Sequence, residues 1–175
     1  MKKALMIALW VVLSLELLVV FTPKTELYFL AEEALENKQV FINGEQTSDF
    51  GWYFRVAGGD IFYGGVKVAR NDTASLFITL FYNQFQISDL MIAEAYGAMI
   101  PARVDLLRAR HTILFPHRIF LSGEGEFGEL SGHINLFSRK IFLTIYPPAG
   151  TSSKIGSIFA GMEKTEKGFL YESDF

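Results

Sequence analysis

The sequence has no cysteine and little histidine. Without a thiol, the chain forms no disulfide, has no thiolate nucleophile and offers no Cys-type zinc ligand. This absence suits a bacterial periplasm as well as a reducing compartment. Only three histidines occur among the 175 residues, and none belongs to a His-x-x-x-His or Glu-x-x-His pattern, so no local spacing supports a zinc site.

The charged residues also lack a pattern that would indicate nucleic-acid binding or enzymatic activity. The net charge is −3 and no Lys/Arg cluster stands out, which argues against nucleic-acid binding. Residues 122–125 (Ser-Gly-Glu-Gly) do not form a Gly-x-Ser-x-Gly elbow. Folding could still bring His133 close to Glu124, Glu126 or Glu129 and so form a metal site. The alternation of apolar and polar residues, however, places Glu124 and Glu126 on the solvent-facing side of a strand. We expect no catalytic residue, no cofactor and no metal.

One long hydrophobic run is present, and it organises the rest of the chain. Residues 4–21 are apolar apart from Glu16 and Ser14, and two lysines precede them. At about 1.5 Å per residue, a helix of this length matches a hydrocarbon core of about 30 Å. We predict a cytoplasmic stub at 1–3, a transmembrane anchor at 4–22 and a periplasmic remainder. The predicted anchor residues include Ala4, Leu9, Trp10, Leu13, Glu16, Leu17 and Phe21.

Two alternatives remain open for this run. A cleaved signal peptide also has lysines before an apolar core, but residues 19–24 (Val-Val-Phe-Thr-Pro-Lys) lack the small residues of a cleavage site. An uncleaved single-pass anchor in the bacterial inner membrane is therefore expected. Glu16 either reaches toward the outer interface, protonated or not, or pairs with a polar group on a neighbouring span.

An amphipathic helix is expected next, over residues 23–38. Thr22 is placed as its N-cap and Pro23 at its first position, and apolar residues then recur at steps of three and four. The stripe consists of Leu27, Leu30, Ala31, Ala34 and Leu35. The acidic residues on the flanks of this helix argue against its lying on an anionic membrane.

Strand patterns fill residues 39–148 and predict an antiparallel meander sheet. Turns are expected at Asn43-Gly44, Asn71-Asp72 and Asn83-Gln84, and short connections between strands favour the meander. Ile119 and Ile134 are expected on one buried face. A helix from Thr151 or Ser152 to about Lys164 or Lys167, then a short strand at 169–171, complete the C-terminal part, 149–175. The expected fold is mainly β, with a helix flanking the sheet at each end.

The spacing of glycines and apolar residues resembles one known group. It runs from Arg108 through Phe115-Pro116, Ile119–Gly125 and Phe127–Leu136 to Arg139–Pro147. This cadence is similar to the sheet repeats of type II secretion protein N and AsmA-like proteins, and the similarity covers about residues 39–148. The resemblance implies a non-enzymatic part of an envelope assembly, or a sheet whose apolar face meets lipid.

Aromatic residues make both faces of the expected sheet partly apolar. The two helices should cover part of this surface, and what stays uncovered is a candidate surface for a partner or for lipid. The predicted partner surface comprises Phe77, Phe81, Tyr82, Phe120, Phe137 and Phe142.

These features predict a non-catalytic scaffold subunit of a large envelope machine, such as a type II secretion or pilus system or the accessory structure of a flagellar motor. The expected partners are membrane lipid at the N-terminal helix and other envelope proteins or copies of the chain itself, with no nucleic acid. The alternative is an AsmA-like lipid-handling module.

Overall fold

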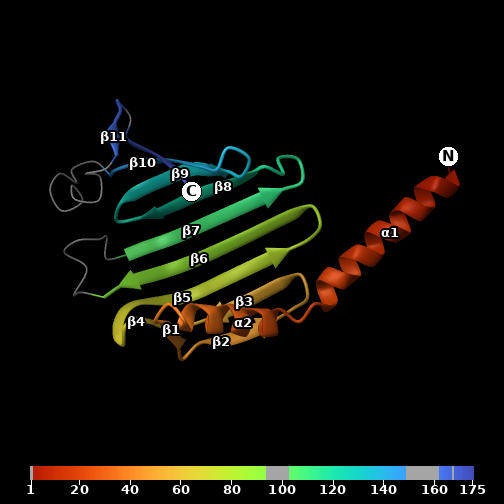
Figure 1. Ribbon diagram of the computed structural model, residues 1–175, viewed down its shortest axis with the longest axis horizontal. Coiled ribbons are helices and arrows are strands. Elements are labelled where there is room, and N and C mark those ends of the chain that lie inside the picture. The colour runs from red at the N-terminus through yellow and green to blue at the C-terminus, as the bar shows by residue number, and fades with distance from the viewer. Residues whose placement is uncertain (1, 94–102, 149–161, 167) are drawn as a thin grey trace.

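The computed structural model describes residues 2–93, 103–148, 162–166 and 168–175. Within these ranges, two helices precede a twelve-stranded antiparallel sheet, which confirms the predicted mainly β fold (Figure 1). The helices are α1 (Lys2–Phe21) and α2 (Lys24–Glu36), which match the two predicted N-terminal helices. The strands are β1 (Val40–Asn43), β2 (Gln46–Asp49), β3 (Tyr53–Ala57), β4 (Asp60–Tyr63), β5 (Val66–Ile78), β6 (Tyr82–Ile92), β7 (Arg103–Thr112), β8 (Arg118–Gly125), β9 (Gly128–Asn135), β10 (Lys140–Tyr146), β11 (Glu163–Lys164) and β12 (Phe169–Asp174).

The first four strands form one interrupted hairpin. β1 pairs with β4 and β2 pairs with β3, and both pairs keep the same register, with Val40 opposite Tyr63 and Asp49 opposite Phe54. The true turn is therefore residues 50–52, and the hairpin predicted at Asn43-Gly44 is wrong. Asn43-Gly44 has the residues of a tight turn, but the chain does not reverse there. Both strands of the hairpin are interrupted at the same position, where Gly58-Gly59 lies opposite Gly44, and they pair again on the other side of this interruption.

Two further predicted turns lie inside strands. Asn71-Asp72 is part of β5, a 13-residue strand that pairs with β3 along one half and with β4 along the other. Asn83-Gln84 belongs to β6, and the chain turns instead at residues 79–81, where the hydroxyl of Thr79 donates to the Tyr82 carbonyl at 2.9 Å. Pairing on both sides outweighs the turn preference of single asparagines.

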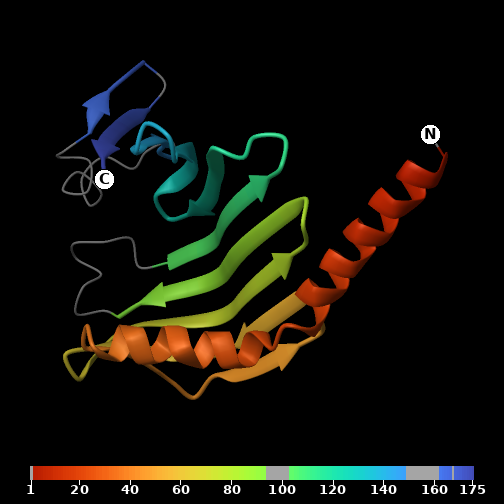
Figure 2. The same cartoon turned by 45° about the vertical axis from the view of Figure 1, so that its right-hand side comes forward.

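The sheet is curled, and its inner face is apolar. Figure 2 shows the strands from β8 onward rising out of the plane of β5–β7. Cross-strand pairs place Ile119 opposite Ile134, as predicted, and continue this face through Leu107 and Phe85 to Phe54. We call this surface, which α2 partly covers, the inner face. Its best-packed part consists of Val104, Phe127 and Ile145, with Met162 and Phe169 against them.

Glycines allow the backbone to bend sharply at β8 and β9. A Cβ atom on Gly132 in β9 would collide with the Phe142 carbonyl oxygen, and one on Gly123 in β8 would lie 2.6 Å from Leu107 Cδ2. Glycine inside a strand is typical of such close approaches. The glycine spacing on which the family resemblance rests therefore permits the bend of the sheet at β8 and β9.

The C-terminal part differs from its prediction. Most of the expected helix lies outside the described residues, and its expected end at Glu163–Lys164 is strand β11. The short strand predicted at 169–171 is present and longer, as β12. The chain leaves β10, forms β11 at the sheet edge and returns as β12 between them.

Candidate functional site: an apolar groove beneath the second helix

An apolar hollow lies between α2 and the inner face, over the strands from β3 to β6. α2 lies across β1–β4, as Figure 1 shows, and encloses a cavity of about 370 Å³ with them. This volume is within the range of small-ligand pockets, which are mostly lined by hydrophobic side chains. The lining side chains include Leu27, Tyr28 and Ala31 from α2, and Phe54, Val56, Leu76, Phe85, Ile87 and Leu90 from the sheet.

The groove exists because α2 does not close down on the sheet. All five residues of the predicted apolar stripe are exposed, with Leu27 at 52% and Leu30 at 61%, and only Leu27 and Ala31 of them line the groove. The less exposed residues of this helix are Lys24, Thr25, Tyr28 and Glu32. Burying a side chain of this size stabilises a protein by about 1.5–3 kcal/mol, so a helix rarely leaves such residues in water. The inner face under α2 is an apolar surface that the chain itself does not fill.

Polar residues also line the groove, among them Tyr28 and Asn71. The hydroxyl of Tyr28 is buried without a hydrogen-bond partner, and Asn71 in β5 is itself buried. Burial raises the pKa of Tyr28, with Glu45 and Glu32 adding to the rise, so the phenol stays neutral and keeps its proton. A buried donor without an acceptor is costly unless a ligand supplies one. The Tyr28 ring lines the groove, and its buried hydroxyl has no partner among the described residues.

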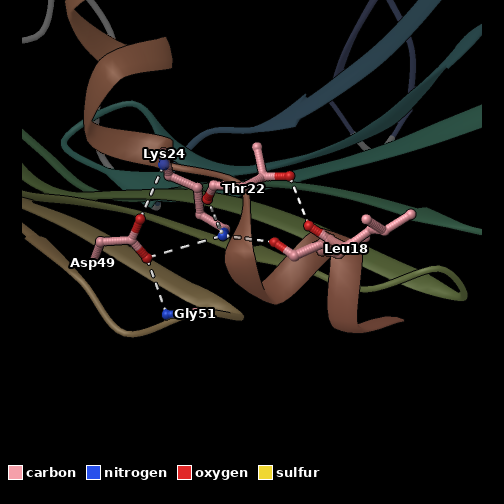
Figure 3. Close-up of polar contacts among 6 residues, drawn as sticks. Leu18, Thr22, Lys24, Asp49 and Gly51 are labelled. Carbon is pink, nitrogen blue, oxygen red and sulfur yellow. Dashed lines mark hydrogen bonds and ion pairs between the residues drawn. The ribbon is translucent and has the colours of Figure 1, made fainter. Parts of the chain in front are cut away.

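A buried lysine fixes the start of α2 and thereby the mouth of the groove. Lys24 is 3% exposed, and its ammonium donates to the carbonyls of Val19 and Thr22, at 2.9 and 3.0 Å (Figure 3). The carboxylate of Asp49 accepts from the backbone N–H of Lys24 and from that of Gly51, both at 2.9 Å. This pair holds the end of α1, the start of α2 and the end of β2 together.

The predicted cap of α2 is therefore wrong. α2 begins at Lys24, after Pro23, and the Thr22 hydroxyl donates backwards to the Leu18 carbonyl of α1 at 2.7 Å. Asp49, 25 residues away, accepts from the first amide of α2 instead. A carboxylate also suits the partial positive charge of a helix N-terminus better than a hydroxyl does.

Glu16 contacts the sheet. Its carboxylate accepts from Trp52 Nε1 at 3.3 Å and from the backbone N–H of Leu80 at 3.1 Å. Neither partner was foreseen, because both lie in turns of the sheet and not on another span. All seven predicted anchor residues lie in α1, which is the one helix in the described part of the chain that is long and apolar enough to cross a membrane.

The six aromatic residues of the predicted partner surface fall into two groups. Four of them lie on the outer face of the sheet, opposite the inner face: Phe77, Tyr82, Phe120 and Phe142. The ring of Phe142 stacks on that of His133, with the ring centroids 5.0 Å apart. Phe81 and Phe137 lie in turns instead of strands. Within the described ranges, no three His, Asp or Glu side chains come together as a metal site.

Of the groove residues, Leu27 and Ala31 belong to the predicted apolar stripe, whereas Tyr28 and the sheet residues were not foreseen. One signal was present, because Tyr28 lies next to that stripe on α2, where a polar atom would need a partner. Comparison with protein-family models, with curated proteins and with solved structures finds no match.

Proposed function

We propose that this chain is a non-catalytic, single-pass module of the bacterial inner membrane that binds the acyl chain of a lipid in the groove beneath α2. One observation carries the proposal: an apolar groove of about 370 Å³ stays open between α2 and the sheet. An acyl chain would cover this surface, and the Tyr28 hydroxyl, once turned from its buried position toward the groove, would donate to an ester or headgroup oxygen. α1 is the anchor, and the lysines before it favour a cytoplasmic N-terminus and a periplasmic sheet.

Lipid analysis of the full-length protein tests this function. The protein is purified in mild detergent, and bound lipid is extracted and identified by mass spectrometry. Ala31→Trp fills the groove, whereas Ala34→Trp adds the same side chain to the same helix outside the groove lining. Wild type and Ala34→Trp should retain lipid and Ala31→Trp should lose it. Absence of lipid from the wild type, or equal retention by both variants, would contradict the proposal.

A scaffold subunit of an envelope machine is the second candidate. The outer-face aromatics and the open sheet edges favour it, since an uncovered edge strand can pair with another chain. β11 forms one edge, and β1 and β2 form the other. Crosslinking in cells followed by mass spectrometry should then identify an envelope partner or a second copy. A protein recovered alone and monomeric would count against this candidate.

A further inference from the structure

The turns at one end of the sheet form a continuous row that begins beside α1. In a meander, alternate turns lie at the same end, and here these are residues 50–52, 79–81, 113–117 and 136–139. Backbone hydrogen bonds of 2.9–3.0 Å join each turn to the next: Ile78 to Trp52, Ile113 to Phe81, and Leu136 to His117. The backbone N–H of Phe175 bonds to the Arg139 carbonyl and adds the C-terminus to the row.

These segments carry an unusual number of exposed large apolar side chains. Leu114 is 80% exposed and Phe137 is 85% exposed. The only charged side chain in the four turns is that of Arg139. We call the following residues the apolar rim: Phe50, Trp52, Phe81, Ile113, Leu114, Phe115, Leu136, Phe137 and Phe175.

The described turns at the other end differ in character. The turn at Gly64-Gly65 has no side chains, although Tyr63 and Val66 beside it are exposed. In the turn between β8 and β9, the side chain of Phe127 packs into the core and is 7% exposed. A monomeric soluble protein rarely exposes a continuous apolar patch, and such a patch indicates a protein or membrane contact.

The position of α1 favours the membrane. Glu16 lies five residues before the end of α1, about 7.5 Å along a helix that rises about 1.5 Å per residue. Because Glu16 bonds to Trp52 Nε1 and to the Leu80 amide, two of the turns lie at the depth of Glu16 and not beyond the end of the helix. Figure 1 shows α1 leaving the sheet at the end that carries these turns. If α1 crosses a bilayer, those turns must enter its outer interface.

We propose that the apolar rim lies in the interfacial layer of the same bilayer that α1 crosses. The inference rests on the proposed function only for the anchoring role of α1. Tryptophan favours this layer, where its ring is half in lipid and its N–H finds a polar partner, here Glu16. Arg139 lies at the far side of the row, where its guanidinium can reach lipid phosphates. The rim thus holds the whole end of the sheet against the lipid.

Tryptophan fluorescence in vesicles of phosphatidylethanolamine and phosphatidylglycerol, with acyl chains brominated at known depths, tests this contact. The chain has two tryptophans, and Trp10 reports α1 when Trp52 is replaced by Phe. In a background without either, Leu114→Trp reports the rim and Tyr63→Trp reports the opposite end. Bromine should quench the emission of Trp10 and of Leu114→Trp, and bromines at shallow depth should quench Leu114→Trp most. The emission of Tyr63→Trp should not be quenched.

The outcomes separate the two proposals. Quenching of Trp10 without quenching of Leu114→Trp would leave the anchor in place and overturn the membrane contact of the rim. A blue-shifted, unquenched Leu114→Trp would also overturn it and would indicate that protein covers the rim. An unquenched Trp10 would overturn the anchor and with it the rim contact.

Discussion

The ammonium nitrogen of Lys24 lies 3.9 Å from one carboxylate oxygen of Asp49, and the other oxygen accepts a 2.9 Å hydrogen bond from the Lys24 backbone N–H. One side chain of the sheet therefore balances a buried charge and holds the start of a helix. The carbonyls that the ammonium also contacts belong to the last turn of α1 and the residue after it. The orientation of both helices relative to the sheet depends on this pair.

Asp49→Ala should destabilise the protein by about 2–4 kcal/mol, because it leaves the Lys24 ammonium buried without a counter-charge. Lys24→Met is the control, since it removes the charge and keeps an unbranched side chain, and it should cost less. Chemical denaturation in detergent measures both. Equal losses would mean that the Lys24 charge does not need Asp49.

Glu16→Leu should detach the turns at 50–52 and 79–81 from α1. Glu16 accepts hydrogen bonds from both turns, and a leucine accepts none. A double-mutant cycle with Trp52→Phe should give a coupling of about 1 kcal/mol, measured as free energies of unfolding. Glu16→Gln is the matched control, because it keeps an acceptor oxygen and should retain part of the coupling. A coupling near zero for Glu16→Leu would contradict the contact.

Tyr28→Phe should leave the stability of lipid-free protein unchanged or raise it by about 1 kcal/mol, because the hydroxyl is buried without a partner. The same substitution should reduce lipid retention if Tyr28 donates to the bound lipid. Denaturation and lipid mass spectrometry on one preparation measure both effects. A clear loss of stability in the lipid-free protein would show that the hydroxyl has a partner within the chain.

Glu32→Gln should stabilise the protein at pH 7 and have little effect near pH 4. Burial raises the pKa of Glu32, and the negative charges of Glu45 and Glu36 raise it further. A carboxyl with a raised folded-state pKa binds its proton more tightly when folded. Stability is therefore lost as the pH rises from the unfolded pKa through the folded one. Thermal unfolding at both pH values gives the comparison, and an equal shift in Tm at each would contradict the prediction.

Gly132→Ala should destabilise the protein by about 1–3 kcal/mol, because the added methyl group meets the Phe142 carbonyl oxygen and Leu143. The neighbouring Ser131→Ala is the control. Its side chain is exposed, and its replacement should change the free energy of unfolding by no more than about 0.5 kcal/mol. If both variants unfold alike in denaturant, the close approach of β9 and β10 is not required for the curl.

Much of the fold could be predicted because it depends on patterns within short stretches. The hydropathy of residues 4–21 predicted α1, and steps of three and four residues predicted α2 to within two residues at either end. Alternation placed Ile119 and Ile134 on one face, and their cross-strand pairing confirms it. These features follow from the periods of a helix and a strand, which the neighbouring residues set by themselves.

The candidate site could not be predicted, because it depends on residues that meet only after pairing. Asn43-Gly44 has the chemistry of a hairpin turn, yet the partner of β1 is β4, and that choice depends on the register of the whole hairpin. In the sequence Tyr28 resembles an ordinary apolar position, and only the packing of α2 on the sheet shows that its hydroxyl is buried without a partner.

The sequence by itself thus determined an apolar helix, an amphipathic helix and a meander of strands, since each is set by a local period. Only the tertiary structure decided that Asp49 meets Lys24, that Glu16 meets the turns and that the apolar face is concave. Those contacts join residues 25 to 64 positions apart, and closing such long loops costs entropy that no local pattern records.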